Sequence, residues 1–123
     1  MRSRALGLAA LLEMGTGLLL LALPAIVVHL LFGVEISGIS LVLGRFGGIC
    51  LVALSVACWP GNDTRWPLYG MLTYTVAVMI YLAVVGLNGH AGILLWPAVV
   101  AHAILAVLLL LARFRKRQDD GGV

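Results

Sequence analysis

Four apolar runs, each close to 20 residues long, constrain this chain more than any other feature of its sequence. The first covers 5–23 with a continuation to 32, and the others cover about 39–58, 68–87 and 93–112. About 20 apolar residues in a helix cross a bilayer core that is about 30 Å thick. Only a helix satisfies all its backbone hydrogen bonds within one segment of this length. The sequence therefore predicts four membrane-spanning helices.

The composition excludes a soluble fold of this size. The 123 residues are 63% hydrophobic and 11% charged, whereas soluble domains are about half apolar and about a quarter charged. The links "GVEISG", "WPGNDTRWP" and "NGHAG" are short, and short links make successive helices antiparallel neighbours. The expected fold is a single all-α transmembrane domain, an antiparallel four-helix bundle.

Positive charges set the expected orientation. Arg2, Arg4, Arg65 and the basic cluster in 113–117 fall on one side of a four-span chain, so the positive-inside rule places both termini in the cytoplasm. The expected location is the inner membrane, with 113–123 as a basic and then polar cytoplasmic tail. The residues expected at the membrane interfaces are Trp59, Trp66, Arg113, Arg115, Lys116 and Arg117 on the inner side and Trp96 on the outer side.

A secretory signal is the alternative for the N-terminal run, because Arg2 and Arg4 precede it and "ALPA" offers small residues. Glu13 fits poorly in the apolar part of such a signal. Cleavage of the signal segment would also leave only three spans.

Three titratable side chains fall inside the spans, and a charge at the bilayer centre costs a few kcal/mol. Glu13 and Arg45 are expected to differ by roughly 9 Å in depth, which an extended arginine largely covers. We therefore expect a Glu13–Arg45 ion pair, with His102, Tyr81 and Tyr74 completing a buried polar site. This site is either a structural clasp that fixes helix register or a ligand or proton site.

Small residues surround these polar positions at helical spacing, which lets membrane helices approach closely. The expected packing positions are Ala9 and Gly17 around Glu13, Gly44 and Gly48 around Arg45, and Ala98 and Ala106 around His102.

Several chemistries are not expected. Cys50 and Cys58 are eight residues apart in one helix, about 12 Å, too far for a disulfide between them. No His, Cys and carboxylate spacing suits a metal, and His29 and His102 lie at different depths, which disfavours haem. No nucleophile–base motif and no nucleic-acid platform accompany the basic cluster. The sequence predicts no enzyme and no cofactor.

Two resemblances bear on the fold. "ALLEMGTG" resembles the first helix of small multidrug resistance transporters, four-helix proteins whose membrane-embedded glutamate, here Glu13, binds cations and exchanges protons. Arg45 has no counterpart there and is expected to neutralise Glu13. "GRFGGICLVALSVACWPG", "YGML" and "GILLWPAVVAHAILAVLL" resemble small uncharacterised bacterial four-helix membrane proteins with a DoxX-like layout, some of whose members are subunits of membrane oxidoreductases.

The favoured function is a non-enzymatic accessory subunit or binding module whose buried polar site holds a lipid, a quinone or a small apolar ligand. The alternative is a proton-coupled small-molecule transporter acting as a homodimer. The expected partners are membrane lipids and either other membrane subunits or further copies of this chain.

Overall fold

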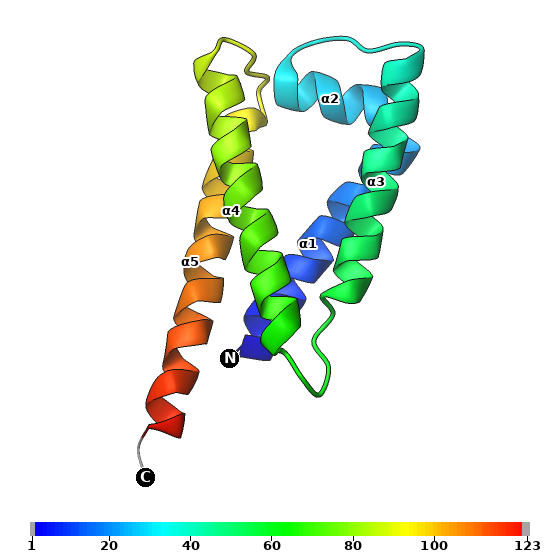
Figure 1. The fold of residues 1–123 in the computed structure, drawn as a ribbon. Helices are drawn as coiled ribbons and strands as arrows, with labels where there is room; N and C mark the ends of the chain where they lie inside the picture. The colour runs from blue at the N-terminus through cyan, green and yellow to red at the C-terminus, as the bar shows by residue number, and fades with distance from the viewer. Residues whose placement is uncertain (1, 122–123) are drawn as a thin grey trace.

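Five α-helices make up the computed structural model, which describes residues 2–121, with the side chains of 116–120 excepted. They are α1 (Arg2–Ala22), α2 (Pro24–Phe32), α3 (Ile39–Ala57), α4 (Arg65–Leu87) and α5 (Leu95–Asp120) (Figure 1). The described residues contain no strand. The helices α1, α3, α4 and α5 are long and apolar enough to cross a membrane. The prediction of an all-α chain with four long apolar helices is confirmed, and its insertion and orientation in a membrane stay predictions.

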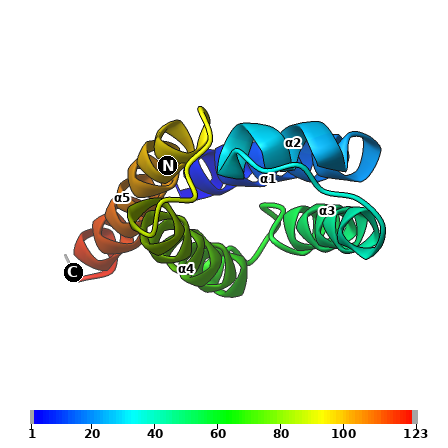
Figure 2. The same ribbon diagram turned by 90° about the horizontal axis from the view of Figure 1, so that it is seen from above.

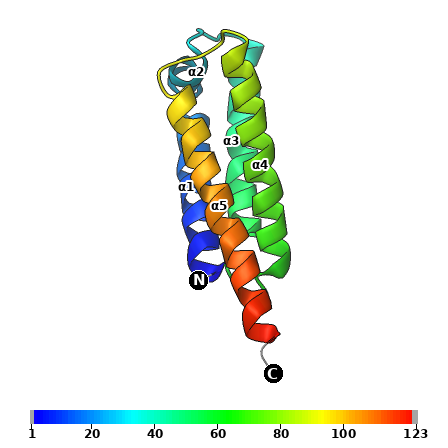
Figure 3. The ribbon, with the colours of Figure 1, turned by 90° about the vertical axis from the view of Figure 1, so that its left-hand side faces the viewer.

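The long helices form two pairs, α1 with α3 and α4 with α5. The helix α1 also packs against α4 and α5, whereas α3 and α4 hardly touch. Figure 1 shows the consequence: the two pairs converge near the N-terminus and separate toward the opposite end, where α2 lies. Figure 3 shows the long helices running between these two ends. We call the end of the bundle near the N-terminus the terminal end, and the opposite end the α2 end. The bundle is therefore joined through α1.

Two glycines bring α1 and α3 into backbone contact. A Cβ on Gly48 would lie 2.6 Å from the carbonyl oxygen of Gly17 and 2.7 Å from the backbone nitrogen of Leu21. A Cβ on Gly17 would lie 2.9 Å from the carbonyl oxygen of Gly48. Only glycine fits at such distances, so this pair sets the closest approach of the two helices.

The apolar core fills the terminal end. Its buried members come from α1, the end of α3, α4 and α5, and are Leu6, Ala9, Ala10, Cys58, Leu68, Met71, Leu105 and Leu109. Cys58 is buried in this core, where a thiol packs as a small apolar side chain. Cys50 is exposed, and the two cysteines are free.

The first apolar run is two helices and not one continued span, which corrects the sequence prediction. Leu23 leaves the helical region, with φ −131° and ψ 57°, and Pro24 opens α2. Proline has no backbone N–H, and its ring clashes with the preceding turn, so the chain turns here. Seen from above, α2 lies across the end of the bundle, alongside the line of α1 (Figure 2).

Hydrogen bonds from the α4–α5 connector hold the far end of α2. The backbone N–H of Gly92 donates to Leu31 and that of Leu94 donates to Leu30, each at 2.8 Å. Carbonyl groups at the end of a helix lack partners within the helix. The connector therefore supplies hydrogen-bond donors to the last carbonyl groups of α2 and holds this helix at the level where α5 begins.

The other helix ends differ from the predicted bounds by a few residues. Pro67 and Pro97 each lie in the first turn of a helix, where proline is tolerated, so α4 begins earlier than predicted. The helix α5 continues to Asp120, through residues expected to form a tail. Arginine, lysine and glutamine are good helix formers, so the helix extends beyond its apolar part.

Replacement of Gly48 by alanine should destabilise the bundle by about 1–3 kcal/mol, because the new methyl group meets backbone that cannot rotate away. The measurement is the free energy of unfolding in detergent. Gly15→Ala is the matched control, since a Cβ at Gly15 in α1 meets nothing within 4 Å. Equal stability of the two variants would contradict the close approach of α1 and α3.

Candidate functional site

A buried carboxylate joins three helices. Glu13 on α1 is only 3% exposed. The Tyr74 hydroxyl on α4 donates a hydrogen bond to Glu13 Oε2 at 3.0 Å, and Nε2 of His102 on α5 lies 3.3 Å from Glu13 Oε1. The rings of Tyr74 and His102 are also neighbours, with centroids 6.5 Å apart. We call these three residues the Glu13 cluster.

The backbone fixes the tautomer of His102. Its Nδ1 lies 2.7 Å from the carbonyl oxygen of Ala98, one turn earlier in α5. A carbonyl oxygen can only accept, so Nδ1 carries a proton. The remaining nitrogen, Nε2, is the atom that faces Glu13. It is buried and makes no aligned hydrogen bond, so its contact with the carboxyl group is electrostatic and within ion-pair range.

This arrangement requires one further proton on the pair. A neutral His102 with its proton on Nδ1 presents a lone pair at Nε2, and an ionised Glu13 presents another at Oε1. Two acceptors facing each other across 3.3 Å in a buried site are unfavourable. A proton on either atom removes the conflict and leaves the pair with no net charge. Loss of that proton leaves one uncompensated negative charge between the helices.

The other buried polar side chains form hydrogen bonds within their own helices. Ser55 on α3 donates to the carbonyl oxygen of Leu51, and Thr75 on α4 donates to that of Met71. Such bonds to the preceding turn are the usual outcome for hydroxyls inside helices. Sequence reasoning did not single out these two residues. Their local bonds leave the Glu13 cluster as the polar link between helices in the described part of the chain.

The structure does not form the Glu13–Arg45 pair that we expected. Arg45 is exposed on α3, and within the described residues His102 is the only basic side chain in ion-pair range of Glu13. Tyr81 is 64% exposed on α4 and also lies outside the cluster. The structure thus brings together Glu13, His102 and Tyr74 and leaves Arg45 and Tyr81 on the surface.

The error for Arg45 lies in the helix face and not in the depth. Gly17 meets Gly48, so Glu13 lies one turn from that contact toward the terminal end and Arg45 lies three residues from it toward the α2 end. These offsets add to about 10 Å along the axis, close to the expected separation. Leu54 of α3, however, packs against the core shared with α4 and α5, whereas Arg45 is exposed.

The predicted packing positions lie on α1, α3 and α5, and four of the six are buried. Ala9, Gly17, Gly48 and Ala106 are buried. A Cβ on Gly44 would lie 3.0 Å from the Cβ of Pro24. Ala98 is partly buried and supplies the carbonyl that holds His102. Gly17 and Gly48 thus bring α1 and α3 together, whereas Gly44 packs against Pro24 at the start of α2.

The aromatic and basic residues predicted at interfaces lie near the two ends. Trp59 and Trp66 lie by the α3–α4 connector, and Trp96 lies at the start of α5, all three exposed. The Arg113 guanidinium lies 5.0 Å from the centroid of the Tyr69 ring, a cation–π contact. Arg115 is exposed. The side chains of Lys116 and Arg117 lie outside the described residues.

Comparison with known proteins gives no relative, since no family model, no curated protein and no solved structure matches this chain.

The chemistry of the Glu13 cluster is proton and hydrogen-bond exchange. A carboxyl, an imidazole and a phenol each donate or accept protons. Among the described residues no three His, Cys, Asp or Glu side chains gather as metal ligands. The cluster therefore suits a partner that donates a hydrogen bond, accepts one or carries a positive charge.

Removal of the Tyr74 hydroxyl should cost about 1–3 kcal/mol, because a buried carboxyl group loses its aligned donor. Tyr74→Phe tests this through the free energy of unfolding in detergent. Tyr81→Phe is the control on the same helix, since its side chain is 64% exposed, and it should change stability by less than about 0.5 kcal/mol. Equal effects would mean that the Tyr74 bond contributes nothing.

Two double-mutant cycles separate the observed pair from the expected one. Glu13→Gln combined with His102→Ala should show a coupling of about 0.5–3 kcal/mol, whereas Glu13→Gln combined with Arg45→Met should be additive within about 0.5 kcal/mol. The measurement is again detergent unfolding. The reverse pattern would place Arg45, and not His102, at Glu13.

Proposed function

We propose that this chain is a non-enzymatic integral membrane module that binds a small apolar molecule with a polar head at the Glu13 cluster. The observation that carries the proposal is that Glu13 is held by a phenol and an imidazole and not by a fixed positive charge. An arginine or lysine clasp would neutralise the carboxyl group permanently. A proton shared with His102 can instead leave or be replaced.

The donors of the cluster favour a ligand that bears a carbonyl or hydroxyl group, such as a quinone. The Tyr74 hydroxyl, now bonded to Glu13, could turn to such a group by rotation about its own C–O bond, and Nε2 of His102 already faces the cluster. The His102 side chain is 15% exposed, so a ligand would reach the cluster past His102. An apolar ring or chain would lie among the surrounding apolar residues.

The proposed orientation places the terminal end, with its basic residues, in the cytoplasm and the chain in the inner membrane. Four long apolar helices and the short α2 make up most of the described chain, so partners would dock through the helices. Other membrane subunits are the proposed partners, with a homo-oligomer as the alternative.

A proton-coupled transporter is the second candidate, and the position of Arg45 favours it. The expected neutralisation of Glu13 by Arg45 spoke against cation binding, and Arg45 is exposed elsewhere. The Glu13–His102 pair without its proton would carry the one negative charge that a cationic substrate needs.

Native mass spectrometry of the protein, gently extracted from its own membrane, tests the module. The expected result is a bound small molecule that Glu13→Gln and Tyr74→Phe weaken and that the surface control Tyr81→Phe retains. A chain with no ligand in any preparation, or a ligand indifferent to Glu13→Gln, would refute the proposal. Co-extracted proteins in fixed ratio would support the subunit role.

Uptake by proteoliposomes tests the transporter. Accumulation of a lipophilic cation should follow an imposed pH gradient and fall at least tenfold in Glu13→Gln, because that variant cannot release the proton. Arg45→Met should transport as the original chain does. Uptake that ignores both the gradient and Glu13→Gln would remove this candidate.

A further inference from the structure

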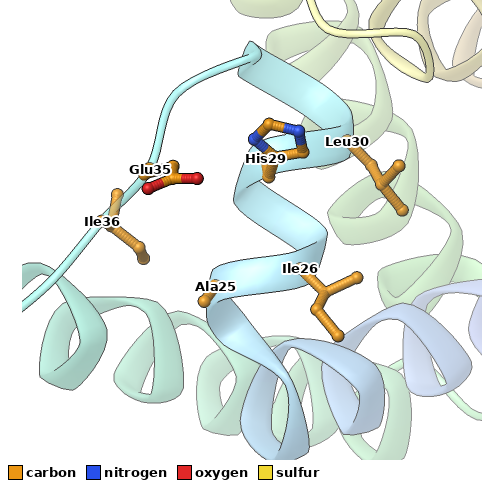
Figure 4. Close-up of a pocket in the computed structure, with 6 residues that line it drawn as sticks. All are labelled: Ala25, Ile26, His29, Leu30, Glu35 and Ile36. Carbon is orange, nitrogen blue, oxygen red and sulfur yellow. The ribbon is translucent and has the colours of Figure 1, made fainter.

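A hollow lies at the α2 end, away from the Glu13 cluster. Its volume is about 310 Å³, and it opens between α2 and the connector that leads to α3. Figure 4 shows Glu35 on the connector facing His29 on α2 across this space. The lining residues are Ala25, Ile26, His29, Leu30, Glu35 and Ile36.

The hollow lies at the level where the membrane spans end. A Cβ on Gly44, in the first turns of α3, would lie 3.0 Å from Pro24, which begins α2. The end of α2 is hydrogen-bonded to Leu94, just before α5. Trp96, in the first turn of α5, is exposed, and tryptophan is enriched where lipid heads meet the hydrocarbon core. A lipid of that leaflet would present its head to α2.

The lining combines apolar walls with a carboxylate. Ala25, Ile26, Leu30 and Ile36 supply the walls. Glu35 is exposed, and no described lysine or arginine lies in ion-pair range of it. The other acidic side chains that the structure describes are those of Glu13, buried in its cluster, and Asp63, in the connector at the terminal end. Glu35 is therefore the negative charge of the α2 end.

We propose that this hollow binds a membrane phospholipid with a primary-amine head. The ammonium group would donate charge-assisted hydrogen bonds to Glu35, and His29 would contact the neighbouring polar atoms of the head. The first part of an acyl chain would lie along Ala25, Ile26 and Ile36. A fatty acid or an anionic lipid is disfavoured, because its charge would face Glu35.

The size of the hollow fits a head and part of a chain. Pockets that hold whole drug-sized ligands measure roughly 300–1,000 Å³, so 310 Å³ takes only part of a phospholipid. The rest of each chain would lie in the bilayer, beside α2. An amine head is favoured over a quaternary ammonium head, because only the primary amine has N–H donors for the carboxylate.

Lipid titration followed by native mass spectrometry tests this site. The purified full chain is titrated with phosphatidylethanolamine and with phosphatidylcholine of the same acyl chains. The original chain should prefer the ethanolamine lipid, and Glu35→Gln should reduce that preference about tenfold, the loss expected for one hydrogen bond to a charged group. Asp63→Asn is the matched control, an exposed carboxylate at the terminal end, and should keep the preference.

A second variant tests the apolar part of the hollow. Ala25→Trp should fill the space and reduce the binding of the ethanolamine lipid, whereas Ala53→Trp, at an exposed position of α3, should not. Unfolding in detergent verifies that all four variants fold. Equal binding of the two lipids by the original chain, or an unchanged preference in Glu35→Gln, would overturn the proposal. So would undiminished binding by Ala25→Trp.

Discussion

The need of one buried carboxyl group for partners ties the two halves of this bundle together. Glu13 lies in an apolar stretch of α1, where an unpaired charge would cost several kcal/mol. Its partners come from α4 and α5, whereas the main packing of α1 is against α3. Because the other buried hydroxyls bond within their own helices, this cluster supplies the directional link between the pairs. The core around Leu6, Met71 and Leu109 supplies the buried apolar area between these helices.

The same cluster gives the molecule a chemical capacity that a purely structural clasp does not need. Ala98 holds the proton on one nitrogen of His102, so the other nitrogen and Glu13 compete for a single proton. A pair of this kind is neutral when occupied and negative when empty. Under the proposed function, a ligand or a cationic substrate would replace the shared proton. A lysine or arginine in the same place would hold Glu13 in one state.

The α2 end follows from a different constraint. Pro24 breaks the first apolar run, and the α4–α5 connector then satisfies the end of α2 through Leu30 and Leu31. The resulting crosswise helix and its connector enclose a hollow that has a carboxylate on one side. The molecule thus carries two polar features at different levels, one deep between helices and one near the end of the spans. The ligands proposed for them differ, because only the first feature is buried.

The sequence by itself determined the helices and their apolar character, since backbone groups in a run of 20 apolar residues have few other ways to be satisfied. It also marked Glu13, His102 and the glycines, because a charge or a close approach in such a run demands compensation. Only the tertiary structure decided the partners. Periodicity fixes which residues share a face, but it leaves open which neighbour that face meets, so Arg45 was expected inside and lies outside. The direction that α2 takes after Pro24 likewise depends on a segment distant in sequence, because the α4–α5 connector bonds to the carbonyl groups of Leu30 and Leu31.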